Sequence, residues 1–198
     1  MDLFLPPDTL TPIALPDGEL ALLRQLALGM GNAEVLAALI AETAWKAEHI
    51  TLWGRRLLQP RLSAWHGEAR YTYSGLTMEP LPFTPLQREI KAAVEQASGR
   101  RFNSVLLNYY RDGRDSMGMH SDDEAELGPA PAIASVSFGA TRTFILKHKR
   151  SKQTLKLELE AGSLLLMSGS TQKNWLHGIN KVTAAVGPRV NLTFRYIF

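Results

Sequence analysis

The sequence predicts an α+β fold in which short β-strands form a β-sandwich or jelly roll and helices pack outside it. Many short strands, separated by turns, are typical of such a core. The helical signals come earlier in the chain, before residue 103. The runs that predict strands are "SVLLNYY", "AIASVSFG", "TRTFILKHK", "TLKLELE", "GSLLLMSG" and "RVNLTFRYIF".

Two helices are expected in the N-terminal half. The first is predicted to start with Asn32 as its N-cap and to run to about Trp45. Its apolar face would be formed by Val35, Leu36, Leu39 and Ile40. The second has stronger end signals, because a capping box and a proline mark its start and a glycine marks its end. These residues are Thr84, Pro85, Gln87 and Gly99.

Composition limits the class of protein. With 198 residues, 45% of them hydrophobic, the chain can bury the core of one domain with an N-terminal extension. It has no cysteine, so a metal would have to be bound by His, Asp or Glu. Acids and prolines interrupt the first residues, "MDLFLPPDTLTPIALPDG", which argues against a signal peptide or a membrane span. We therefore expect a cytoplasmic protein, monomeric and not attached to a membrane.

The net charge is +3, and the basic residues are concentrated in two segments. Such patches favour a polyanionic partner, although solvated strand ends would give the same pattern. The first comprises Arg55, Arg56, Arg61 and Arg70, against Glu68. The second comprises Lys147, Lys149, Arg150, Lys152 and Lys156.

A metal site is predicted around "MHSDDE". In an extended segment the side chains of His120 and Asp122 project to the same face and can hold one ion. Of the other histidines, His177 is the best third ligand, since it follows the strand "GSLLLMSG" inside the predicted β region. Two histidines and one carboxylate are the facial triad of non-haem Fe(II) oxygenases, which leaves coordination positions open.

The last predicted strand carries a polar face. In "RVNLTFR", alternation places four polar residues together, and two of them are arginines that could clamp the carboxylates of a dicarboxylate. A surface strand with its polar face in water is the alternative. The four residues are Arg189, Asn191, Thr193 and Arg195. In "NYY", Asn108 and Tyr110 share a face and would suit the same ligand.

Together, these motifs resemble the AlkB family of iron- and 2-oxoglutarate-dependent nucleic-acid dealkylases. The similar segments are "LNYYRDGRDSMGMHSDDE", "IASVSFGATRTFILKHK", "GSLLLMSGSTQKNWLHGI" and "PRVNLTFR". The upstream segment "LQPRLSAWHGEARYTYSGLT" resembles the branch that acts on double-stranded DNA. The resemblance covers roughly residues 50–198, whereas residues 1–49 carry no motif that matches.

The resemblance implies a double-stranded β-helix core, Fe(II) at the triad and 2-oxoglutarate at the six polar residues of the two strands. It divides the chain into an N-terminal extension, residues 1–49, and a dioxygenase domain, residues 50–198, with a nucleotide-recognition segment at 50–80. The implied activity is oxidative demethylation of bases such as 1-methyladenine or 3-methylcytosine in DNA, with release of formaldehyde. The protein would act in the cytoplasm, at the nucleoid of a bacterium or in the nucleus of a eukaryote.

The resemblance also implies substrate contacts. Asp123 and Glu124 match acids of the family that contact a cationic base. The alternative is that they form a solvated acidic turn with no role in substrate binding. Tyr71 and Tyr73 would line the entrance for a base flipped out of the duplex, unless they pack in the core.

A hairpin is expected at "ITLWGRR", because Gly54 permits a tight turn that would hold Trp53 at its tip. An aromatic residue there can fill the gap left by a flipped base, while Arg55 and Arg56 hold phosphates. By the resemblance, Arg61 in "QPR" matches a further basic position beside this hairpin. A Trp buried in the core is the alternative. The family usually has Phe at this position.

Three other functions remain open on the sequence alone. A 2-oxoglutarate-dependent RNA demethylase, or a hydroxylase of a protein or small molecule, would keep the metal and cosubstrate motifs. A catalytically silent nucleic-acid binder would keep the basic patches and lose a metal ligand, but all three ligands are present.

Overall fold

The computed structural model describes residues 9–52, 55–68, 71–73 and 76–198. For residues 50–52, 55–56, 71–73 and 76–78, only the backbone is described.

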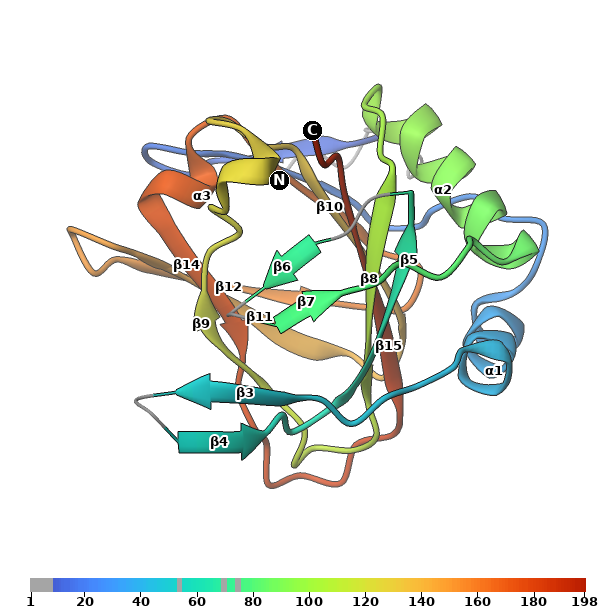
Figure 1. The fold of residues 1–198 in the computed structure, drawn as a ribbon. Helices are drawn as coiled ribbons and strands as arrows, with labels where there is room; N and C mark the ends of the chain where they lie inside the picture. Colours follow the sequence, from blue (N-terminus) through green and yellow to red (C-terminus); the bar gives the residue numbers. More distant parts are fainter. Residues whose placement is uncertain (1–8, 53–54, 69–70, 74–75) are drawn as a thin grey trace.

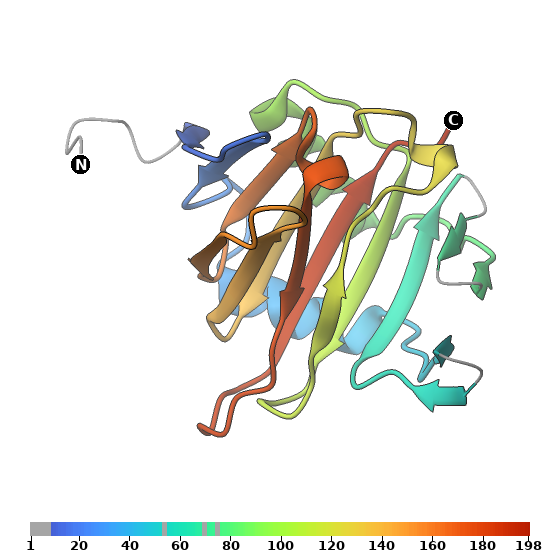
Figure 2. The ribbon, with the colours of Figure 1, turned by 90° about the vertical axis from the view of Figure 1, so that its left-hand side faces the viewer.

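Two antiparallel sheets form the core within the described residues, as predicted for a jelly roll (Figures 1 and 2). The larger sheet has seven strands in the order β1, β2, β13, β10, β15, β8, β5. In that order they span Thr11–Ile13, Glu19–Leu23, Leu164–Ser168, Ile133–Gly139, Arg189–Arg195, Ser104–Tyr110 and Leu62–Gly67. The smaller sheet has four strands, β12 (Thr154–Leu159), β11 (Arg142–His148), β14 (Trp175–Ile179) and β9 (Met117–His120).

Two hairpins lie beyond the edge strand β5 of the larger sheet (Figure 2). The first pairs β3 (His49–Leu52) with β4 (Arg55–Leu58), and Leu52 faces Arg55 across the two-residue connection. This confirms the predicted hairpin, although Trp53 and Gly54 themselves lie outside the described residues. The second pairs β6 (Tyr71–Tyr73) with β7 (Leu76–Met78).

Helices α1 (Asn32–Glu42) and α2 (Pro85–Ser98) lie on the same side of the larger sheet (Figure 1). The end signals of α2 are confirmed. The Thr84 side chain accepts from the backbone N–H of Gln87, and Gly99 ends the helix with a left-handed φ of 63°. The ends predicted for α1 are wrong. Gly31 is its N-cap, because the Asn32 side chain is bonded to Gln25 and to the Ala161 carbonyl instead. At the other end, Thr43 already has extended backbone.

Alternation along the strands divides the core into two layers. One face of the larger sheet packs against the helices, with Val105, Val136 and Leu192 meeting Val35 and Ile90. The other face looks toward the smaller sheet and contains a second apolar cluster. That cluster includes Leu106, Ile133, Phe144, Leu146, Leu165 and Trp175. The polar residues of β15 fall on this inner face, because they alternate with Val190, Leu192 and Phe194.

The N-terminal segment is joined to this core. β2 pairs with β13 from Leu23↔Leu164 to Glu19↔Ser168, so residues 11–23 extend the larger sheet. The division into an extension (1–49) and a domain (50–198) stays a prediction. Among the described residues, no helix is both long and apolar enough to cross a membrane.

Candidate active site

One cavity between the two sheets brings the predicted metal and cosubstrate residues together. It is lined by all nine of them: Asn108, Tyr110, His120, Asp122, His177, Arg189, Asn191, Thr193 and Arg195. Ladder pairing explains the grouping, since Asn191 lies opposite Asn108 and Arg189 opposite Tyr110 where β15 and β8 run antiparallel. Residues directly opposite each other in a sheet project to the same face. The surface-strand alternative for β15 is therefore wrong, because all four polar residues are buried.

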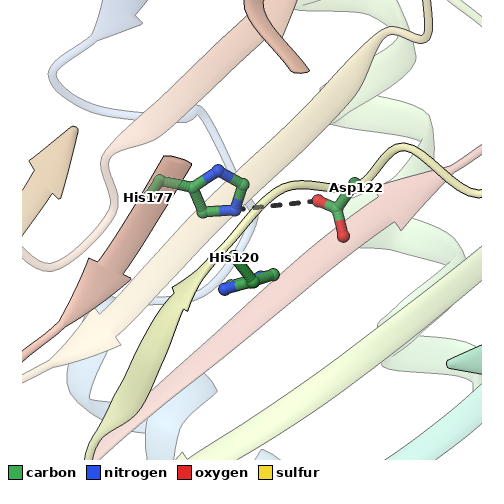
Figure 3. Close-up of side chains that lie close together, drawn as sticks. All are labelled: His120, Asp122 and His177. Carbon is green, nitrogen blue, oxygen red and sulfur yellow. Dashed lines mark ion pairs between the residues drawn. The ribbon is translucent and has the colours of Figure 1, made fainter. Parts of the chain in front are cut away.

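His120, Asp122 and His177 form the candidate metal centre (Figure 3). One ligand atom from each lies within 4.8 Å of the others. His120 ends β9 and lies opposite His177 on β14, and Asp122 follows in the loop after β9. The dashed line in Figure 3 joins His177 Nε2 to Asp122 Oδ2, 3.8 Å apart. This spacing is too long for a hydrogen bond but suits two ligands of one ion.

The second ring nitrogen of His120 determines its tautomer. Nδ1 lies 2.9 Å from the Gly118 carbonyl oxygen, which can only accept, so Nδ1 carries the proton. In the neutral ring, Nε2 then carries the lone pair that a metal would bind. A hydrogen bond from the other ring nitrogen is how proteins usually orient a ligand histidine.

Burial and neighbouring charge keep the three ligands in the forms that bind metal. Burial would raise the pKa of Asp122, but Arg195 and the two histidines outweigh it and lower that pKa to about 2. Burial, with His120 adding to it, lowers the pKa of His177 to about 3, and burial also lowers the pKa of His120. At neutral pH, the site holds a carboxylate and two neutral imidazoles. The 3.8 Å contact between His177 and Asp122 is therefore not an ion pair.

Arg195 and Asp122 form a buried ion pair. Arg195 Nη2 donates to Asp122 Oδ1 at 2.7 Å, and both side chains are almost fully buried. Asp122 Oδ2 accepts no hydrogen bond from any described residue. The pair leaves this second oxygen facing the histidines.

Arg189 carries a buried charge that the described residues do not neutralise. Its Nη2 donates to Ser137 Oγ at 2.9 Å and its guanidinium lies 5.1 Å from the centre of the Tyr110 ring. Nε and Nη1 are buried and have no hydrogen-bond partner among the described residues. Burial lowers the pKa of Arg189 to about 10, so it remains charged at pH 7. Two unpaired N–H groups on a buried guanidinium suit a carboxylate ligand.

Two serines of β10 belong to the site but were not predicted. Ser135 Oγ accepts from Asn191 Nδ2, and Ser137 Oγ accepts from Arg189 Nη2. Their signal is the alternation in "IASVSFG", where serines occupy every second position of an otherwise apolar strand. Asn191 also donates to the Val136 carbonyl, and its Oδ1 accepts from Thr193, so the row of polar groups is held rigidly.

The structure corrects the position expected for Arg61. Its side chain is buried, with Nε donating to Asn108 Oδ1 at 2.7 Å and Nη1 near the Ser116 carbonyl. A phosphate at the protein surface does not reach a guanidinium held in this way. Arg61 instead orients the side chain of Asn108. Because Asn108 Oδ1 accepts from Arg61, the Nδ2 group of Asn108 must point away from Arg61.

The predicted substrate residues are described only in part. The Asp123 side chain is exposed and accepts from Ser121 and from Lys149, the latter at 3.3 Å. Glu124 is half-buried and precedes the short 3₁₀ helix η1 (Ala125–Leu127). Tyr71, Tyr73 and Arg55 lie in hairpin strands of which only the backbone is described, so the predicted roles of their side chains are untested.

Two histidines outside the site are also buried. His66 Nδ1 lies 2.8 Å from the Pro82 carbonyl oxygen. His148 lies among lysines in "LKHKRSK", which suggests a solvent-facing position, but it is buried. The side chain follows Phe144 and Leu146 on the inward face of β11 and packs edge-on against Trp175.

Comparison with known proteins agrees with this geometry. The family model of the 2OG-Fe(II) oxygenase superfamily matches residues 21–195. The chain belongs to this superfamily. Within it, the chain belongs to the AlkB family, as its relatives indicate.

Human alpha-ketoglutarate-dependent dioxygenase alkB homolog 3 is 43% identical over 174 residues, which are 83% of this chain and 61% of that protein. Human DNA oxidative demethylase ALKBH2 is 42% identical over 158 residues, 75% of this chain and 60% of that protein. The chain thus spans about three fifths of the length of these relatives. The solved structure of OsALKBH1 superposes with a TM-score of 0.63 over 93% of this chain and 99% of that one. At 15% identity, this likeness shows the fold alone.

The residues present fit the Fe(II) and 2-oxoglutarate after which the superfamily is named. Two imidazoles and a carboxylate are a donor set suited to non-haem Fe(II). Arg189, in the same cavity, has two N–H groups that no described residue engages, and these suit a carboxylate of 2-oxoglutarate.

The lowered pKa of His177 predicts acid sensitivity of the protein after chelation of its metal. The ordinary pKa of 6.5 applies to the unfolded chain and a pKa of about 3 to the folded one. Between these values, the unfolded chain binds a proton that the folded protein excludes, so stability is lost as the pH falls through this window. The loss approaches about 1.4 kcal/mol per pH unit for such a group. Urea unfolding from pH 7 to pH 4 measures it. In His177→Gln the free energy of unfolding should depend less on pH. The same slope as in the wild type would contradict the lowered pKa of His177.

Proposed function

We propose that the protein is an Fe(II)- and 2-oxoglutarate-dependent dioxygenase that demethylates N-alkylated bases in nucleic acid. The observation that carries the proposal is one cavity that combines the His120, Asp122 and His177 triad with Arg189, whose charge no described residue neutralises. Membership of the AlkB family supports it. DNA carrying 1-methyladenine or 3-methylcytosine is the proposed substrate.

Each polar residue of the cavity has a proposed role. His120 Nε2, Asp122 Oδ2 and His177 hold Fe(II), and Arg195 keeps Asp122 ionised through its other oxygen. Arg189 binds one carboxylate of 2-oxoglutarate through the two N–H groups that no described residue engages. The cosubstrate pocket is completed by Asn108, Tyr110, Asn191, Thr193 and Arg195.

When bound, iron with 2-oxoglutarate and O₂ supplies an oxidant for a C–H bond, and 2-oxoglutarate leaves as succinate and carbon dioxide. The N-methyl group of the base gains a hydroxyl. The resulting hemiaminal collapses to formaldehyde because the alkylated base carries a positive charge, which makes the neutral base a good leaving group. Phe144 and Met117 line the cavity with apolar surface and help to exclude water from the reacting atoms.

Charge on the surface supports a nucleic-acid substrate. The exposed carboxylate of Asp123 lies directly after the metal ligand Asp122, where it can stabilise a cationic base, and Glu124 follows it. On the β11–β12 hairpin, Lys147, Arg150, Lys152 and Lys156 are exposed and available to phosphates. A base must leave the helix to reach the cavity, at a cost of a few kcal/mol of unstacking.

For duplex DNA, we propose that Trp53 fills the gap left by the flipped base, with Gly54 and Arg55 in the same hairpin. Tyr71 and Tyr73 would line the entrance to the pocket. The paired backbone of β3 and β4 supports the hairpin on which this idea depends. The protein would then act as a monomer in the cytoplasm, at the nucleoid or in the nucleus, where alkylated DNA occurs.

The proposal is tested by incubation with methylated oligonucleotides, followed by formaldehyde assay and mass analysis. Iron and 2-oxoglutarate are omitted in turn. His120→Ala should lose metal binding and turnover completely, because two ligands do not hold the ion. Normal succinate release by this variant would show that the metal assignment is wrong.

Removal of the Arg189 guanidinium should weaken 2-oxoglutarate binding, because a carboxylate would lose its buried charged partner. We expect Arg189→Met to cost about 2 to 5 kcal/mol of binding free energy. Calorimetric titration of the Mn(II)-loaded protein with 2-oxoglutarate gives the affinity. The matched control is Arg114→Met. Arg114 is exposed, pairs with Asp112 two positions earlier and does not line the cavity. Equal affinities of the Arg189 variant and the control would contradict the role.

Trp53→Ala should reduce repair of a duplex much more than repair of a single strand, because only the duplex has a gap to fill. Trp53→Phe should keep the wild-type ratio, since an aromatic ring remains. The two repair rates are compared on oligonucleotides of identical sequence. Equal losses on both substrates would rule out the wedge and leave the metal site unaffected.

A further inference from the structure

The main chain of the metal ligand Asp122 is held by a buried glutamine. The Asp122 N–H donates to Gln172 Oε1 at 3.0 Å, and both residues are at most 1% exposed. The orientation of the Gln172 amide follows from chemistry. A peptide N–H can only donate, so the carbonyl oxygen of Gln172 must face Asp122 and its NH₂ group faces Met167 Sδ, 3.6 Å away.

Sheet pairing does not hold Asp122 in place. β9 ends at His120, and its ladder with β14 has two residue pairs, His177↔His120 and Ile179↔Met117, with an irregularity between them. Asp122 lies beyond the last pair. Its side chain is fixed by Arg195, but Arg195 belongs to β15 of the opposite sheet. A main-chain anchor is needed to set the distance from Asp122 to His177.

Gln172 lies in the segment that leads to His177. It belongs to the short helix α3 (Thr171–Asn174), which connects β13 to β14, and His177 follows in β14. This helix is fixed by the N-terminal segment. Thr171 Oγ1 donates to the Glu19 carbonyl and accepts from the Glu19 amide, and Trp175 Nε1 donates to the Pro16 carbonyl. Gln172 therefore connects one ligand, Asp122, to the rigid segment that carries another.

A second contact extends from the same residue to the substrate side. Lys149 Nζ donates to the Gln172 carbonyl at 2.9 Å and pairs with Asp123 Oδ2 at 3.3 Å. The consecutive residues Asp122 and Asp123 are thus both connected to Gln172, the first directly and the second through Lys149.

We propose that Gln172 is a positioning residue that sets Asp122 at metal-binding distance from His177. This inference rests on the proposed metal site, since it assigns Gln172 a role only if the triad binds an ion. Loss of the acceptor releases the Asp122 backbone and leaves a buried N–H without a partner. The carboxylate then no longer converges with the histidines, although the fold persists.

The test measures Mn(II) affinity by calorimetry, in the absence of 2-oxoglutarate. Gln172→Met keeps the size of the side chain and removes the acceptor, and it should weaken Mn(II) binding by about 10- to 100-fold. Gln172→Glu retains a carboxyl oxygen at the same reach and should recover most of the affinity. If Gln172→Met does not fold, Gln172→Asn replaces it, because its amide is one methylene too short to reach Asp122.

Gln87→Met is the matched control. Gln87 is equally buried, and its Oε1 also accepts a backbone N–H, that of Thr84, but it belongs to α2 on the far side of the larger sheet. Gln87→Met should lose stability in urea unfolding and keep wild-type Mn(II) affinity. If both variants lost the same stability and kept the same affinity, Gln172 would be only a structural residue and the proposal would fail.

His120→Ala separates this failure from failure of the metal site. Wild-type Mn(II) affinity in His120→Ala would disprove the site itself. Lost affinity in His120→Ala, together with wild-type affinity in Gln172→Met and Gln172→Asn, would disprove only the role of Gln172.

Discussion

The buried ion pair between Arg195 and Asp122 is the interaction on which the site depends, because it joins the two sheets at the cavity. Arg195 comes from the larger sheet, and Asp122 from the loop after β9 of the smaller one. Taking both charges out of water is costly, and removing one partner of such a pair typically costs about 3 to 5 kcal/mol. The pair also keeps the Asp122 carboxylate ionised and leaves Oδ2 to face the histidines.

The same desolvation acts on every charged group of the cavity, with different results. It lowers the pKa of both histidines and so keeps their imidazoles neutral for metal binding. It lowers the pKa of Arg189 only to about 10, and the guanidinium stays charged with two N–H groups that the described residues leave unpaired. Arg195 is paired with the carboxylate of Asp122, whereas no described residue supplies a counter-charge for Arg189. Two arginines on one strand therefore have different electrostatic surroundings.

The faces of the strands separate stability from function. Val190, Leu192 and Phe194 of β15 pack under the helices, while their neighbours along the strand build the polar cavity. A slip of one residue in the register of β15 would exchange these two sets, burying arginines against α1 and α2. β15 is paired on both sides, with β8 over the whole strand and with β10 from Arg189 to Phe194, and this double pairing opposes such a slip.

Much of this protein could be predicted from the sequence, because the determining signals are local. The period of two in "RVNLTFR" and "SVLLNYY" identified the cavity face, and the caps Thr84 and Gly99 identified α2. The spacing of His120 and Asp122, with cysteine excluded, pointed to the triad that the structure brings together.

Contacts between distant residues were decided only by the tertiary structure. Arg61 belongs to a basic segment of the sequence, which suggests a surface position. In the structure it is buried and donates a hydrogen bond to Asn108, 47 positions away. His148 reads as part of a basic loop, yet the pleat of β11 turns it inward against Trp175. The role of Gln172 cannot be predicted from its own segment. Its partner Asp122 lies 50 positions earlier, and no sequence pattern links the two residues. Alternation and spacing along the chain are enough to predict which faces the strands present and which side chains can bind metal. Which polar groups meet depends on how the two sheets pack, and no local period encodes that packing.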